Sequence, residues 1–560
     1  MSRSFAVVLA LAALSPGRAS ATALDALGPL PPDTGWAIAV TEPSVPLERL
    51  RGLFDLLHAA KKEIPDAEAI AAFLRQALGF NPLDDRDLAD QGVDLARGIA
   101  FHGRIEGLMG PVFAIDVSIA TTDPTRLRGM LARLAGLVGL REGATSRVAG
   151  ADVVVWEGFT SLVMFASPGW VHVCVGSNGD VLLGEAKRIL KAGKGLAGVP
   201  VMKAQAKGIL GARGIGAWMD LAALARAAIL HDAKRREETR KYVNPEEVAR
   251  FDEEARREAE QYREVGRLGV ALGGLEIARD HVDGRLFTSY DKPGRALYAK
   301  LFPRAKVPGF DVEAISRASA LGLGVQVDAA AFIQWLIGKE PDVRIEWAWL
   351  DDFVRKTFAL DLMKDVVGAL QGHVAFIVHG VAPLTSAELA AAHGPPGELI
   401  FAHVQWALLL RADGRRLGPA ITSLFDQAAK VGLHPERRET GATTWYSVSV
   451  ESPQLQLHVG VGPDAVVLGG GPGLPDLASG WTAPAGRPSE AMAWVTVSSD
   501  AVYATLQGLL TPDAVAMLHL KQELLTFRRA EPVLKLLHLG TLVLRSVSSG
   551  FQLEGLLHHD

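Results

Sequence analysis

The sequence is poor in cysteine, in long apolar runs and in charge of one sign. Cys174 is the single cysteine in 560 residues, so an intrachain disulfide framework is excluded. The fold must therefore be held by burial of apolar side chains, which make up 49% of the chain. Lys plus Arg (58) nearly balances Asp plus Glu (63), which argues against a general binder of nucleic acid or anionic membranes.

The first 21 residues are typical of a secretory signal peptide. Arg3 gives a positive start, residues 5–14 form an unbroken apolar run, and Ala-Ser-Ala at 19–21 fits a cleavage site. A run of this length spans only about half of a ~30 Å hydrocarbon core, and no later stretch is long and apolar enough for a transmembrane helix. A buried N-terminal helix is the alternative interpretation. We therefore expect an exported protein, periplasmic or secreted after cleavage near Ala21.

The rest of the chain shows internal similarity. Residues 172–176 (HVCVG) recur as residues 458–462 (HVGVG), and a second predicted strand follows each copy, at 181–184 and 466–469. Asp123 and Asp413 each precede a predicted amphipathic helix, over 125–138 and 416–431, where a short acidic side chain can cap free backbone amides.

The later landmarks occur in the same order in both halves. A capping residue followed by proline, which favours a helix start, occurs at Asn244-Pro245 and again at Thr511-Pro512. The pattern predicts an internal duplication, with a first copy at 22–291, a connecting segment at 292–321 and a second copy at 322–560. Because many strands turn directly into another strand, we expect an α+β fold. Each copy would be a mostly antiparallel sheet with helices on one face and a helical hairpin near its end.

This layout resembles a family of exported bacterial proteins known only as a domain of unknown function. The resemblance is carried by the signal peptide, the duplicated order of elements and the progression from strand, glycine and strand through a helix to residues 217–220 (AWMD). It implies export and a repeated α+β unit. It supplies no catalytic residues, cofactor or metal ligands.

Known enzyme motifs are missing from the sequence. The glycines at 469–473 do not open a helix with the dinucleotide-binding spacing, and no G-x-S-x-G or HExxH motif is present. The acidic residues from Asp84 to Asp94 miss the EF-hand spacing and fit a helix start better. His172 and His458 are the one histidine pair matched between the copies, and each fits a half-buried strand position. We therefore predict no catalytic, cofactor-binding or metal-ligating residue.

The predicted helical hairpins differ between the copies. Residues 232–264 hold 9 Lys or Arg and 11 Asp or Glu, which indicates a solvated, ion-paired hairpin. The second hairpin is apolar over more than one face, so core, a partner or lipid must cover it. If a partner or an apolar ligand does so, the candidate contact residues are Val515, Leu518, Leu525 and Phe527.

Together these observations favour an exported, non-enzymatic cell-envelope protein that binds an apolar ligand or a protein partner. The expected partners are another envelope protein or a lipid-like ligand, with no nucleic acid and no cofactor. Two alternatives remain open: an exported hydrolase with an unrecognised site, and a structural envelope component.

Overall fold

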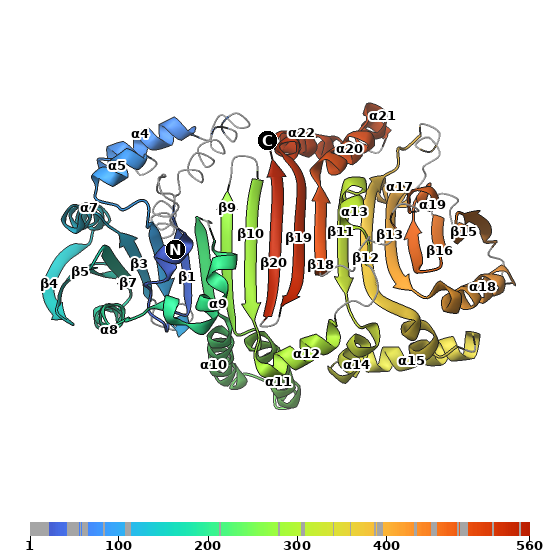
Figure 1. Ribbon diagram of the computed structural model, residues 1–560, viewed down its shortest axis with the longest axis horizontal. Coiled ribbons are helices and arrows are strands. Elements are labelled where there is room, and N and C mark those ends of the chain that lie inside the picture. The colour runs from blue at the N-terminus through green and yellow to red at the C-terminus, as the bar shows by residue number, and fades with distance from the viewer. Residues whose placement is uncertain are drawn as a thin grey trace. The chain divides into compact units, whose positions relative to one another are not determined.

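The computed structural model describes most of the chain, namely residues 22–41, 55, 58, 65–81, 84–106, 114–211, 214–277, 281–303, 309–339, 341–358, 360–385, 388, 396–430, 434–449, 456–478, 481, 491–517, 520–547 and 550–559. The predicted signal peptide lies outside these residues. The chain divides into two compact units (Figure 1). Unit 1 comprises Met1–Gly294 and Ser549–Gln552, and unit 2 comprises Arg295–Ser548 and Leu553–Asp560.

The strands that the structure describes in unit 1 form an antiparallel sheet. They are β1 (Trp36–Val40), β2 (Ile99–Gly103), β3 (Ala114–Ala120), β4 (Arg141–Val148), β5 (Ala151–Glu157), β6 (Ser161–Ser167), β7 (Trp170–Gly176), β8 (Ile215–Asp220), β9 (Val270–Ile277) and β10 (His281–Ser289). Their order across the sheet is β4-β5-β6-β7-β3-β2-β1-β8-β9-β10.

The helices described in this part of the chain precede, separate or follow those strands. They are α2 (Ala23–Leu27), α4 (Ala67–Leu78), α5 (Asp85–Asp90), α7 (Pro124–Leu137), α8 (Gly179–Leu190), η1 (Leu196–Gly198), α9 (Pro200–Ile209), α10 (Leu221–Arg240), α11 (Val248–Gly266) and α12 (Lys292–Leu301). Helix α12 continues from unit 1 into unit 2. On β7, Val173 packs with α7 on one face, while Cys174 packs with α8 on the other. Helices therefore cover two faces in this region of unit 1, where the sequence analysis expected one.

The strands described in unit 2 also pair antiparallel with one another. They are β11 (Leu321–Gln326), β12 (Leu370–Val381), β13 (Val404–Ala412), β14 (Glu436–Thr440), β15 (Thr443–Ser449), β16 (Gln456–Val461), β17 (Ala465–Gly470), β18 (Ala491–Ser498), β19 (Leu537–Val547) and β20 (Gly550–His559). Their order is β14-β15-β16-β17-β13-β12-β11-β18-β19-β20. If the strands of each unit are numbered from one to ten along the chain, their order across the sheet is the same in both units.

The described helices of unit 2 lie near the ends of its strands or pack on its sheet. They are α13 (Val312–Ala318), α14 (Ala329–Lys339), α15 (Pro341–Phe358), η2 (Leu362–Val366), η3 (Val367–Ala369), α17 (Pro396–His403), α18 (Gly414–Lys430), α19 (Leu474–Ala478), α20 (Ser499–Leu509), α21 (Pro512–Met517) and α22 (Lys521–Leu536). Of these helices, α13, α18 and α19 pack on the sheet. Figure 1 shows α20 and α22 near one end of β18 and β12, with α14 and α15 near the other.

The α+β class and the antiparallel sheets are confirmed. Two helix starts are also where the sequence placed them, because Asp123 accepts hydrogen bonds from the amides of Thr125 and Arg126, and Asp413 accepts one from Arg415.

The predicted strand at 181–184 is wrong. Those residues lie in α8, since Asn178 accepts from the amides of Asp180 and Val181 and so begins a helix directly after β7. The predicted connecting segment contains α12 and α13. The duplication itself stays a prediction.

Candidate functional site

Two features of the described chain are candidates for function: an apolar, partly exposed sheet face in unit 2 and a buried polar network in unit 1. The open face of unit 2 is defined here by the outward side chains of β19, β18, β11 and β12. In its central row, Leu542 lies opposite Val495, Val495 opposite Leu323, and Leu323 opposite Phe376. Directly opposed residues of neighbouring strands point to the same side of a sheet, so these side chains form one continuous surface.

The rows on either side of the central one are equally apolar. One row consists of Leu544, Ala493, Val325 and Val374, and the other of Gly540, Val497, Leu321 and Val378. These three rows therefore contain no charged or hydrogen-bonding side chain.

Exposure separates this surface from the opposite face of the same strands. Leu323, Val497 and Leu542 are 37%, 42% and 45% exposed. On the other face, Ala375 and Ile377 are fully buried in a core cluster with Trp445 and Trp494. A water-facing side of an antiparallel sheet normally alternates to polar residues, and here it does not. This exposed apolar surface is therefore a candidate binding site.

The second feature is a chain of hydrogen-bonding side chains beneath α8 in unit 1. Ser118 Oγ lies 2.8 Å from His102 Nε2 and 2.8 Å from His172 Nδ1, and His172 Nε2 lies 2.8 Å from Ser167 Oγ. The side chains come from β2, β3, β6 and β7, and the ladder registers point them to one side of the sheet. Ser118 lies directly opposite His172, whereas His102 and Ser167 are each displaced by two residues from the position opposite their partner. His102, Ser118 and His172 are all buried.

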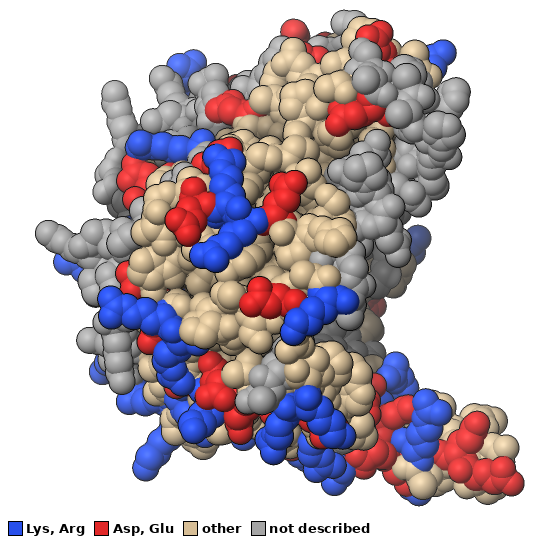
Figure 2. Space-filling view, turned by 90° about the vertical axis from the view of Figure 1, so that its right-hand side faces the viewer, with Lys and Arg blue, Asp and Glu red and all other residues tan. Residues whose placement is uncertain are grey.

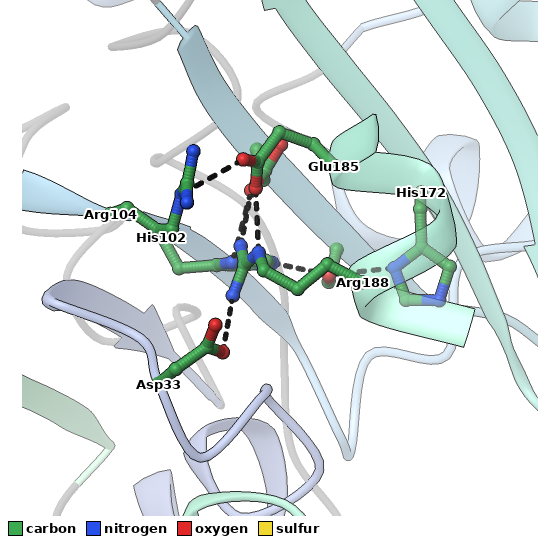
Figure 3. Close-up of polar contacts among 8 residues, drawn as sticks. Asp33, His102, Arg104, His172, Glu185 and Arg188 are labelled. Atoms are coloured by element: carbon green, nitrogen blue, oxygen red, sulfur yellow. Dashed lines mark hydrogen bonds and ion pairs between the residues drawn. The ribbon is translucent and has the colours of Figure 1, made fainter. Parts of the chain in front are cut away.

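Arg188 on α8 connects this layer to carboxylates (Figure 3). Its guanidinium donates to Asp116 at 2.9 Å, to Glu185 at 2.6 Å and to Asp33 at 3.0 Å. Arg104 lies 3.1 Å from the second oxygen of Glu185. His102 Nδ1 is 3.7 Å from Asp116 Oδ2, which is too long for a hydrogen bond. The network thus ties β2, β3 and α8 to the segment that follows α2.

Burial shifts the ionisation of these groups. It lowers the pKa of His172 to about 4. Burial also lowers the pKa of His102 well below its usual range, and the charge of Arg188 acts in the same direction. Burial also raises the pKa of Asp116 to about 6, although Arg188 opposes the shift. For Arg188, burial acts to lower the pKa, but Asp116 and Glu185 outweigh it and raise the value. At neutral pH both histidines are therefore uncharged and the Asp116–Arg188 pair is ionised.

These shifts predict how acid affects stability. Between pH 6.5 and 4 the unfolded chain protonates His172 and the folded chain does not, so this group costs stability as pH falls. Asp116 acts oppositely between pH 6 and 3.8, because the folded chain takes up its proton first. His172→Gln removes the first effect, so we expect the variant to lose about 2 kcal/mol less than wild type between pH 7 and pH 5. Urea unfolding at the two pH values measures this, and equal losses would contradict the assignment.

The arrangement of Asp116, His102 and Ser118 resembles a serine nucleophile that is activated by a base. Such a serine could act only if a substrate can reach it. Ser118 is 1% exposed. The cavity that Ser118, His172 and Trp170 line with α2 and the segment after it has a volume of ≈ 10 Å³. A cavity of this size holds about one water molecule. In this conformation the network holds the sheet, α8 and the chain after α2 together, and it leaves no space for a substrate beside Ser118.

The four residues nominated from the sequence lie in or near the second hairpin. Val515 in α21 is partly buried, and Leu525 in α22 is 43% exposed. Phe527 is partly buried with its ring 5.6 Å from that of Tyr503 in α20, and Leu518 lies outside the described residues. The structure thus separates exposed Leu525 from packed Phe527. Their role in binding stays a prediction.

Neither candidate feature was predicted from the sequence, although a residue pattern in the sequence indicates each of them. In β18 and β11 apolar residues continue at successive positions where a half-buried strand would alternate with polar ones. In β3, Asp116 and Ser118 stand two apart within an otherwise apolar strand and therefore point the same way. Polar residues at alternate positions of an apolar strand predict a buried polar layer that neighbouring strands also contribute to.

Charge and metal chemistry point to no further site among the described residues. Figure 2 shows one side of the molecule on which acidic and basic side chains are interspersed, without a broad patch of either sign. Among the residues that the structure describes, no group of three or more His, Cys, Asp or Glu side chains is placed to hold a metal ion. No helix in the described ranges combines the length and hydropathy needed to cross a bilayer.

Comparison with known proteins gives no family. No family model matches the chain, and no curated protein matches it. Two solved structures, crystal forms III and I of TP0453, are similar at 10% and 9% sequence identity, each with a TM-score of 0.23. Each match covers 51% of this chain, and 88% and 87% of the respective TP0453 chains. We draw no functional argument from likeness at this level.

Proposed function

We propose that this chain is an exported, non-enzymatic cell-envelope protein that binds an apolar ligand on the open face of unit 2. The observation that carries the proposal is the central row from Leu542 through Val495 and Leu323 to Phe376, apolar throughout and partly exposed. Burying exposed apolar surface gains about 25 cal/mol per Å², so a ligand covering this row is stabilised by it.

The size of the face favours a lipid-like ligand over a protein partner. The apolar row continues from Phe376 to Leu408 and Leu468, so it crosses six strands. On β13 and β17, however, Leu410 and Val466 of the flanking row pack with Leu417 of α18. At ~4.8 Å between strands and ~6.8 Å between alternate residues, the three rows on the four strands of the open face measure roughly 14 by 14 Å, or about 200 Å². A stable protein interface needs about 800 Å² on each partner. A single acyl chain, about half of a ~30 Å bilayer core in length, fits within the face.

Export is supported by the sequence pattern and by the residue that cleavage would expose. Cleavage after Ala21 makes Thr22 the first residue, and its backbone nitrogen lies 2.7 Å from Asp25 Oδ2. A new positive terminus there would pair with that carboxylate. Thr22 precedes α2, whose Ala23, Ala26 and Leu27 are buried, so the mature chain would begin with an anchored helix.

The alternatives explain the described features less well. A hydrolase acting through Ser118 needs room that the ≈ 10 Å³ cavity lacks. A purely structural component would be expected to cover both sheet faces, whereas Leu323 and Leu542 remain exposed. The proposal accounts for the open face directly.

Substitution on the open face tests the proposal. Leu323→Glu places a carboxylate in the centre of the row, and burying it against an acyl chain is costly, so affinity for palmitate should fall at least about tenfold. Titration of the purified chain with palmitate, followed by calorimetry, measures the affinity. Leu424→Glu is the matched control, since Leu424 is similarly exposed, at 40%, but lies on α18.

The control should bind palmitate as wild type does. Equal binding by wild type and Leu323→Glu would remove the open face as the site. Failure of wild type to bind any palmitate would count against an acyl ligand altogether.

A further inference from the structure

A second apolar surface lies on the corresponding strands of unit 1. In β1, β8, β9 and β10, Ile38 lies opposite Ala217, Ala217 opposite Gly273, and Gly273 opposite Leu286. Ile38 and Leu286 are 47% and 37% exposed, and Ala217 is exposed as well. This row is called the open face of unit 1.

The neighbouring rows have the same chemistry. One contains Trp36, Met219, Ala271 and Thr288, and the other contains Val40, Ile215, Leu275 and Gly284. Thr288 is the single hydrogen-bonding hydroxyl among them, and no charged side chain belongs to these rows. The opposite face of the same strands is occupied: Trp218 is buried and donates to the carbonyl of Thr34, and Arg285 donates to the carbonyl of Gly208 in α9.

The two open faces share three positions in the two strand orders. β1 and β11 are each seventh, β8 and β18 eighth, and β9 and β19 ninth, counted from β4 and β14. Ile38 and Leu323 each lie in the middle of a strand that pairs with a neighbouring strand on both sides. The shared feature is thus an apolar row that crosses the seventh, eighth and ninth strands and is exposed at the seventh.

We propose that unit 1 carries a second acyl-chain site on this face, so that one chain binds two acyl chains, one on each unit. This inference rests on the proposed function, the binding of an apolar ligand by unit 2. The row spans four strands, or about 14 Å, which matches an acyl chain of about 15 Å. With a width near 14 Å its area is about 200 Å², far below the roughly 800 Å² per partner of a stable protein interface. The uncharged rows can contact an acyl chain but offer no partner for a polar headgroup. The headgroup of the ligand would therefore stay in water.

Counting bound ligands tests the proposal. Native mass spectrometry of the purified full chain with palmitate should show two bound molecules at saturation. Ile38→Glu and Leu323→Glu should each reduce the number to one, and the double variant should bind none. Leu137→Glu and Leu424→Glu are the controls, because both residues are exposed leucines that lie on helices, and each control should keep two.

The outcomes separate this inference from the proposed function. One bound palmitate that is lost only in Leu323→Glu overturns the second site and keeps the site on unit 2. No bound palmitate in wild type contradicts both. Ile38→Asn is the milder companion variant, and thermal unfolding of each variant shows whether a lost ligand reflects a lost fold; two ligands retained by folded Ile38→Glu and Ile38→Asn also overturn the second site.

Discussion

Arg188→Leu should lower the free energy of unfolding by about 3–5 kcal/mol, among the largest effects of any single substitution in unit 1. Arg188 donates to Asp116, Glu185 and Asp33, and the side chains of Asp116 and Glu185 are only 2% and 7% exposed. Leucine fills much of the same space and provides no charge, so buried Asp116 loses its ion-pair partner and Glu185 keeps only Arg104. Urea unfolding at pH 8 measures the loss.

The source of this effect can be separated by a second substitution. Asp116→Asn in the Arg188→Leu background removes one unpaired charge and should recover part of the stability. The loss in Arg188→Leu should also be smaller at pH 5 than at pH 8. The pKa of Asp116 is about 6 even beside Arg188, so at pH 5 the folded chain can protonate this carboxyl. A loss that is small at both pH values would show that the network contributes little to the fold.

Ile377→Ala should cost about 2–5 kcal/mol of unfolding free energy, with no change in palmitate affinity of the folded protein. Ile377 is fully buried and packs in the cluster that contains Trp445 and Trp494. Leu323→Ala, on the open face, should cost only about 1 kcal/mol, because the side chain is already 37% exposed. It should nevertheless weaken palmitate binding.

This pair of variants tests whether the two faces of one sheet have different roles. Chemical denaturation gives stability, and calorimetry on the folded proteins gives affinity. The same stability loss in both variants, with unchanged binding in both, would contradict the division into a core face and a binding face.

Local signals in the sequence predicted much of the fold. Asp123 and Asp413 begin helices because their carboxylates accept backbone hydrogen bonds, and this depends only on neighbouring residues. Residues 172–176 were expected to form a strand and lie in β7, where Cys174 is buried. The failure at 181–184 has a local cause too, since Asn178 begins α8 where a strand was expected.

The candidate sites depend on information that the sequence does not express locally. Leu323, Val495 and Leu542 are far apart in the chain, and they share a row only because β18 lies between β11 and β19. His102 and His172 likewise meet at Ser118 through ladder register. Whether an apolar strand residue faces a core or an open surface is decided by what packs on it. Composition and periodicity do not contain that information.

In unit 1 the polar network and the open face lie on opposite sides of the sheet. In unit 1, Arg188 and the buried histidines hold α8 and the segment after α2 on one side of the sheet, while Ile38 and Leu286 on the other side stay exposed. A rigid sheet whose second face is left apolar is preorganised for a ligand, because little side-chain ordering is needed on binding.

The most direct test is to purify the chain from its own cell envelope without detergent exchange and to analyse it by native mass spectrometry and lipid extraction. We predict a chain that begins at Thr22 and carries acyl-containing lipid that is absent when Leu323→Glu and Ile38→Glu are combined. A ligand-free wild-type chain that also binds no added palmitate would contradict the account.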